Sequence, residues 1–146
     1  MRPALLFALG FAGLTALGTW LWLAGGDALY AQAIAPLARE IYELLGIRGR
    51  GSLRRTRFIN LVPFTALMLL TPRLAWRRRL GGLLLGWLAL CLSHIALNGY
   101  AIASGARGHL PPAAAHASDA LPLLLWLVIA RDFAREKLGS LRRRGA

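Results

Sequence analysis

The residues that decide the fold are PALLFALGFAGLTALGTWLWLA at positions 3–24, a stretch without a charged side chain. An α-helix of this length measures about 33 Å, which is enough to cross a hydrocarbon core of about 30 Å. Apolar residues make up 57% of the 146-residue chain, more than a water-soluble domain of this size can bury. The sequence therefore predicts an integral membrane protein. Because the run is longer than the apolar region of a cleaved signal, about 7–15 residues, we expect it to remain as the first span.

Three further apolar stretches follow, and short groups of arginine lie between and after them. We expect a single membrane domain over residues 1–146. Its transmembrane helices are expected at about 3–24, 58–72, 80–103 and 118–134. The second span is short, about 22 Å as a helix, so Arg57 and Arg73 at its two ends would extend toward the lipid headgroups.

The segment 28–47 differs from these spans because it is amphipathic. Its apolar residues recur at helical spacing, namely Tyr30, Ile34, Leu37, Ile41, Leu44 and Leu45. The charged Arg39, Glu40 and Glu43 occupy other faces, so we expect an interfacial helix that lies on the membrane. If the segment crossed the membrane instead, its two carboxylates would be buried at a cost of several kcal/mol. The predicted fold class is all-α: a bundle of four transmembrane helices plus one interfacial amphipathic helix.

The net charge of +12 comes mainly from basic residues that flank the apolar stretches. Flanking groups of this kind set membrane topology and bind anionic lipid headgroups, so we expect no nucleic acid as a partner. The expected partners are the lipid bilayer and other integral membrane proteins. With both termini in the cytoplasm, more of the 18 Lys and Arg side chains fall inside than outside. The preference for Arg over Lys and the abundance of Leu, Ala and Gly indicate a bacterial protein of the inner membrane.

Small residues at four-residue intervals predict where helices approach one another closely. Ala4, Ala8, Ala12 and Ala16 form one stripe, and Gly82 and Gly86 form another. Small side chains allow helix backbones to pack tightly in a membrane. Each stripe serves either association with other membrane proteins or packing within the bundle, and the sequence leaves both uses open.

A group of polar residues from three predicted helices lies at one depth, near the outer membrane face. This predicted outer-face cluster consists of Arg57, Asn60, His94, Asn98, His116 and Asp119. A histidine inside a membrane needs a hydrogen-bond partner, so we expect Asn60, His94 and His116 to lie together. We expect His94 to be uncharged because burial disfavours the imidazolium. Alternatively, Asn60 and Asp119 only cap helices and the cluster is structural.

The single cysteine, Cys91, lies three residues before His94, so the two side chains could touch on a helix. A thiol in apolar surroundings is poorly ionised and is therefore a weak nucleophile. No spacing of ligands indicates a metal site, and no cofactor is expected. If the protein is an enzyme, the candidate catalytic residues are His116, His94 and Cys91; otherwise we expect none.

Several segments in the second half of the chain resemble a known family. They are RFINLVPFTAL at 57–67, TP at 71–72, WRRRL at 76–80 and SHI at 93–95. In order and spacing they resemble the core of the exosortase and archaeosortase family over about 57–133, closest to the small membrane proteins associated with exosortase systems. The resemblance implies a helical membrane protein. Enzymes of this family are transpeptidases that process C-terminal sorting signals at the outer membrane face with a Cys, an Arg and a His.

The catalytic positions of the family are only partly matched. The Cys position falls near Asn60, the Arg position near His94 and the His position near His116, so only His116 carries the residue of the family. An amide cannot act as a thiol nucleophile, and histidine is a poor substitute for a permanently charged arginine. The resemblance therefore implies the architecture without the chemistry.

The sequence leaves three functions open. We favour a non-catalytic accessory or structural subunit of a membrane complex, associated with an exosortase system. The alternative is an exosortase-like membrane transpeptidase or protease that acts at the outer face. A second alternative is a small supernumerary subunit of a respiratory or photosynthetic complex. A transporter is not expected because no span carries an internal carboxylate.

Overall fold

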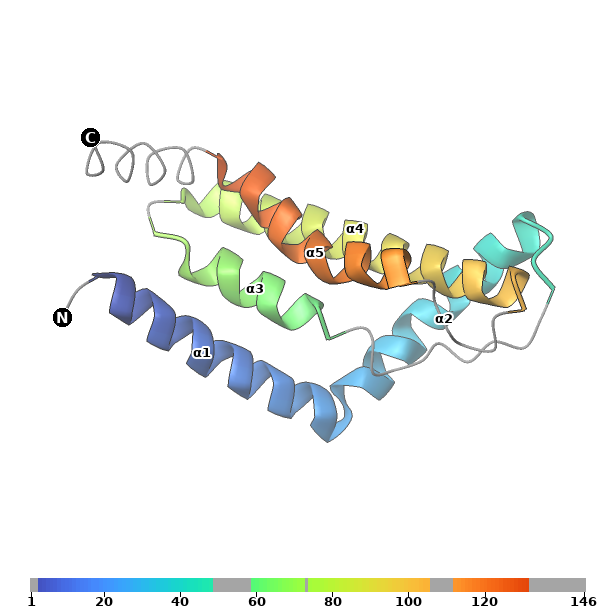
Figure 1. The fold of residues 1–146 in the computed structure, drawn as a ribbon, viewed down its shortest axis with the longest axis horizontal. Helices are drawn as coiled ribbons and strands as arrows, with labels where there is room; N and C mark the ends of the chain where they lie inside the picture. Colours follow the sequence, from blue (N-terminus) through green and yellow to red (C-terminus); the bar gives the residue numbers. More distant parts are fainter. Residues whose placement is uncertain (1–2, 49–58, 73, 106–111, 132–146) are drawn as a thin grey trace.

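The computed structural model describes residues 3–48, 59–72, 74–105 and 112–131 (Figure 1). These residues form only helices and turns, so the all-α class is confirmed for the described part of the chain. The elements are α1 (Pro3–Leu21), the π-helical turn η1 (Trp22–Gly26), α2 (Asp27–Leu44), α3 (Leu61–Leu70), α4 (Trp76–Ala103) and α5 (Pro112–Ile129).

Two helical stretches are long and apolar enough to cross a membrane. One is Leu5–Leu44, which runs through the turn η1, and the other is Trp76–Ala103. The apolar helices Leu61–Leu70 and His116–Ile129 are shorter than this test requires. The predicted number of four transmembrane helices and the interfacial position of α2 therefore stay predictions.

Among α1, α3, α4 and α5, helices that follow one another in the sequence run in opposite directions, which leaves α3 and α5 parallel. Val62 and Leu70 of α3 pack against glycines at the end and the middle of α1, while Phe64 and Met68 pack against glycines early in α4. Helix α3 is thus antiparallel to both α1 and α4. Helix α5 returns along α4, so α1 begins and α5 ends at the same end of the bundle (Figure 1).

The chain changes direction between α1 and α2 at Gly25. This residue has φ 131° and ψ −6°, a conformation that residues with a Cβ rarely adopt. Beyond it, α2 runs beside the C-terminal half of α4 (Figure 1). Helix α3 ends for a different reason, because Thr71 precedes Pro72 and takes an extended ψ of 111°.

The core lies where α3, α4 and α5 meet. Leu61, Phe64, Met68 and Leu90 are its buried members. Gly82 and Gly86 of α4 allow α3 to approach: a Cβ at Gly82 would lie 2.6 Å from Met68 Cε, and one at Gly86 would overlap the Phe64 ring. The glycine stripe therefore packs within the bundle, and its use as a contact with another protein is not supported.

The alanine stripe of α1, unlike the glycine stripe, is not buried within the bundle. Ala8, Ala12 and Ala16 are exposed, whereas the side chain of Ala4 lies outside the described part of the structure. Helix α1 instead contacts α3 through Gly10 and Gly18. The stripe does not pack within the bundle because it lies on roughly the opposite face of the helix from Gly10 and Gly18.

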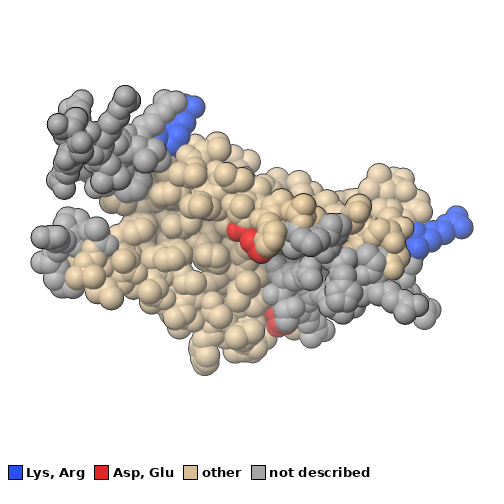
Figure 2. Space-filling model, viewed as in Figure 1, with Lys and Arg blue, Asp and Glu red and all other residues tan. Residues whose placement is uncertain are grey.

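Along the side of the bundle seen in Figure 2 most of the described surface is uncharged, and Lys and Arg appear at its two ends. Leu23 of η1, Leu84 of α4 and Val128 of α5 are 70%, 72% and 71% exposed. Arg77 and Arg78 are exposed at the start of α4, and Arg48 is exposed beyond α2.

Replacing Gly86 should test the close approach of α3 and α4. We expect Gly86→Ala to destabilise the bundle by about 1–3 kcal/mol because the added methyl group displaces the Phe64 ring. Gly81→Ala is the matched control, since a Cβ there meets nothing within 4 Å; it should be neutral or stabilise the helix by about 0.5–1 kcal/mol. Unfolding of the purified protein in detergent, followed by circular dichroism, measures both. Equal effects would contradict the packing described here.

Candidate functional site

The site is built around His94, which is 1% exposed on α4. Its Nε2 lies 2.8 Å from Oδ1 of Asn60, at the start of α3, and its Nδ1 lies 2.7 Å from the hydroxyl oxygen of Tyr30 on α2. Both ring nitrogens are therefore hydrogen bonded, and one buried histidine connects three helices.

Asn60 extends this network to α5. Its Nδ2 donates to the backbone oxygen of Ser118 at 3.1 Å and approaches the Ser118 hydroxyl at 3.4 Å. The carbonyl is available because Pro122, four residues later, has no N–H with which to bond it. The proline thus leaves an acceptor on α5 that Asn60 satisfies, as helices in apolar surroundings require.

The donors and acceptors of this network can be assigned from the Ser118 carbonyl, which is its one backbone acceptor. Because Asn60 donates to the Ser118 carbonyl through Nδ2, its Oδ1 must accept. His94 therefore donates from Nε2. Because burial disfavours the charged imidazolium, Nδ1 of the neutral ring accepts from the Tyr30 hydroxyl. The Tyr30 hydroxyl also lies 3.3 Å from Cys91 Sγ. We call Tyr30, Asn60, Cys91, His94 and Ser118 the polar junction.

A second polar contact joins α2 and α4. The Tyr42 hydroxyl donates to the backbone oxygen of Ile95 at 2.8 Å and accepts from Asn98 Nδ2 at 3.0 Å. Asn98 therefore bonds Tyr42 on α2. Of the predicted outer-face cluster, Asn60 and His94 thus lie in one contact and Asn98 lies in another.

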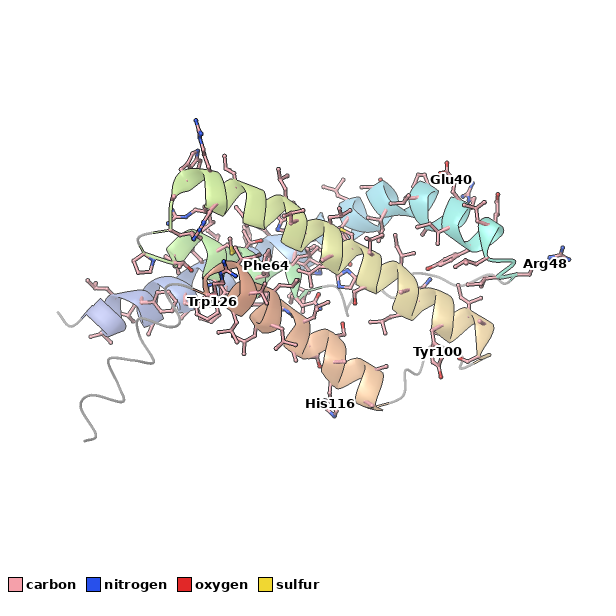
Figure 3. The ribbon with its side chains drawn as sticks, turned by 90° about the horizontal axis from the view of Figure 1, so that it is seen from above. Glu40, Arg48, Phe64, Tyr100, His116 and Trp126 are labelled. Atoms are coloured by element: carbon pink, nitrogen blue, oxygen red, sulfur yellow. The ribbon has the colours of Figure 1, made fainter. Side chains whose placement is uncertain are left out.

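The expected grouping of Asn60 with His94 is confirmed, but the expectation for His116 is wrong. His116 is exposed, and Figure 3 shows it on the side of α5 that points away from α4. Two residues along an α-helix correspond to a rotation of about 200°, so His116 and Ser118 cannot face α3 together. Asp119 is also exposed, and Arg57 lies outside the described residues.

Three expectations about single side chains are corrected as well. Asn60 precedes α3, but its side chain makes no capping hydrogen bond and instead bonds His94 and Ser118. Ser118 does not start α5, because the helix already begins at Pro112. Cys91 contacts Tyr30, and His116 takes no part in that contact.

Sequence reasoning missed Tyr30 and Ser118 as members of the site. Tyr30 belongs to the apolar face of the amphipathic segment, and nothing in its spacing distinguishes it from a packing residue. For Ser118 a signal exists: a proline four residues later leaves its carbonyl without the usual helical donor. Such a carbonyl inside an apolar bundle requires a side-chain donor.

The arrangement is suited to joining helices. Among the described residues, no three His, Cys, Asp or Glu side chains gather as metal ligands. His94 uses both nitrogens within the junction, and Cys91 is near a phenol hydroxyl, which is not a general base at neutral pH. In comparisons with known proteins, the chain matches no family model, no curated protein and no solved structure. The resemblance to exosortases therefore stays a prediction.

Removing the amide of Asn60 should destabilise the bundle. We expect Asn60→Leu to cost about 1–3 kcal/mol because it leaves His94 Nε2 and the Ser118 carbonyl without partners in a buried site. Ser118→Ala should cost less, since Asn60 bonds the backbone oxygen at the shorter distance. The exposed His116 is the control, and His116→Ala should change stability by less than about 0.5 kcal/mol. Unfolding in detergent measures all three variants, and a loss at His116 as large as that at Asn60 would contradict this account of the site.

Proposed function

We propose that the protein is an integral membrane protein and that its apolar helices α1, α3, α4 and α5 are its transmembrane spans. One observation carries the proposal: none of the residues in the most apolar window of Leu5–Leu44 is buried inside the protein. A core helix of a soluble protein would be covered by other elements, whereas apolar surface of this extent needs lipid or another protein around it. The contacts of α1 with α3 support a first helix that stays with the bundle.

The distribution of charge supports an orientation across the bilayer. The exposed arginines lie at the two ends of the bundle (Figure 2), where anionic lipid headgroups can bind them. We propose the bacterial inner membrane, with the ends of the bundle at Pro3 and Arg131 facing the cytoplasm. In this orientation α2 stands beside the outer half of α4. Glu40 and Glu43, both exposed, would then face the outer surface.

Within that membrane we propose a non-catalytic role as an accessory or structural subunit of a complex, associated with an exosortase-type system. The exposed alanine stripe of α1 supports it, because small residues let a second membrane helix approach closely. The resemblance over 57–133 supports the link to exosortases. The transpeptidase alternative gains no support from the geometry, because Cys91 and His116 do not meet and both nitrogens of His94 are engaged.

Cysteine labelling tests the orientation. In a Cys91→Ala chain, Ser104→Cys at the end of α4 should react with a membrane-impermeant maleimide added to intact cells. Ala75→Cys, at the other end of α4, should react only after the membrane is opened. Both positions are exposed in the folded protein, so burial of a site by the protein itself does not explain a difference in labelling. The reverse pattern would overturn the orientation, and equal labelling of both sites would overturn the membrane-spanning position of α4.

A bulky residue in the alanine stripe tests the accessory role. We expect Ala12→Leu to abolish the co-isolation of other membrane proteins from native membranes, because the larger side chain prevents close helix approach. Ala120→Leu, at an exposed position of α5, is the matched control and should leave co-isolation unchanged. Both variants should accumulate like the natural protein. Partners that stay bound to Ala12→Leu would exclude this face as the contact.

A further inference from the structure

Helix α2 is held against the bundle by one narrow row of side chains. Tyr30, Ile34, Ala38 and Tyr42 are spaced four residues apart, so they share one face of the helix. Ile34 and Ala38 are the buried apolar residues of α2, at 8% and 2% exposure. We call these four residues the docking stripe.

Much of the remaining apolar surface of α2 is not used for packing. Leu37, Leu44 and Leu45 are 44%, 87% and 67% exposed, although the amphipathic pattern places them among the apolar positions. A helix with few buried apolar contacts belongs to the least stable part of a fold. The attachment of α2 to α4 therefore depends strongly on the docking stripe.

Each end of the docking stripe carries a tyrosine whose hydroxyl bonds α4. Tyr30 bonds His94 Nδ1 at 2.7 Å, and Tyr42 bonds the Ile95 carbonyl at 2.8 Å. The Tyr42 ring also needs Gly99, because a Cβ there would lie 2.9 Å from its Cε1. The contact is thus made of two polar ends and a short apolar centre.

The connection to α1 has the properties of a hinge. Gly25 adopts φ 131° between two helices, and a Cβ at this position would meet nothing within 4 Å. Glycine is therefore required there by the backbone conformation and not by lack of space. The neighbouring Trp22 has a buried indole nitrogen without a hydrogen-bond partner among the described residues, and its ring packs against Tyr30 at a centroid distance of 5.4 Å. An unpaired buried donor next to the hinge opposes the docked arrangement.

We propose that α2 is a hinged arm that rotates about Gly25 between the docked position and an undocked position, in which it stays helical. Undocking breaks the bonds of Tyr30 and Tyr42 and uncovers His94 Nδ1, Asn98 and the Ile95 carbonyl on one face of α4. The arm would thus control access to the polar junction from the side of α2. This motion does not depend on the accessory role proposed above.

Spin-label distances in the full-length protein, reconstituted in lipid nanodiscs, test the arm. Labels at Gln32→Cys on α2 and Leu85→Cys on α4, both exposed positions, report docking in a Cys91→Ser chain, which keeps a hydrogen-bonding group beside Tyr30. Tyr30→Phe and Tyr42→Phe should each lower the ratio of docked to undocked arm about fivefold. Tyr100→Phe, at an exposed tyrosine of α4, is the matched control and should leave the ratio unchanged.

The hinge is tested with the same label pair. Gly25→Ala should shift the distances toward the undocked arm, because alanine strains the backbone at this φ. Gly13→Ala in α1 is the control, since its Cβ meets nothing and its φ is ordinary. A second pair, Leu17→Cys on α1 and Leu69→Cys on α3, should keep its distance in all variants. The proposal is overturned if the tyrosine and hinge variants leave the first pair unchanged, or if they broaden both pairs together, which would mean that the whole bundle loosens.

Discussion

The His94 ring donates a hydrogen bond to Asn60 and accepts one from Tyr30, and Asn60 in turn donates to the Ser118 carbonyl. Helices α2, α4 and α5 and the residue before α3 all place polar groups at this point. A buried polar group without a partner costs several kcal/mol in apolar surroundings. The depth and rotation of each of these helices are therefore constrained together, since moving one of them would leave its neighbour unsatisfied.

The rest of the bundle is consistent with this constraint. Towards the other end of α4, Gly82 and Gly86 let Met68 and Phe64 of α3 come close to the helix. There the Thr71 hydroxyl accepts from Trp126 at 2.7 Å and the Thr71 carbonyl accepts from Arg79 at 2.7 Å. Polar contacts thus join α3, α4 and α5 near both ends, and close packing joins α3 to α4 in between. In a lipid bilayer, where the lipid tails are as apolar as the helix surfaces, close packing and interhelical hydrogen bonds of this kind hold helices together.

Among the described residues, α1 and α2 each contact only one helix of the other three, α3 and α4 respectively. Helix α1 packs on α3 and leaves its leucines and its alanine stripe exposed, while α2 depends on the docking stripe and the conformation of Gly25. Helix α1 therefore offers an apolar surface suited to another membrane helix. Helix α2, which is connected to it, offers an arm able to move. The three-helix unit of α3, α4 and α5 provides the fixed part against which both act.

The sequence by itself determined the helices. The apolar runs and the amphipathic segment predicted the helices, and the spacing of Gly82 and Gly86 predicted a close approach. It also placed Asn60 and His94 at one depth.

Only the tertiary structure decided that Tyr30 and Ser118 complete the junction, that Asn98 bonds Tyr42, and that His116 faces outward. For α3, α4 and α5 the physical reason is that these helices are largely apolar on all sides, so no periodic pattern indicates which face turns inward. Rotation about the helix axis is settled by side-chain packing and by the pairing of buried polar groups between helices.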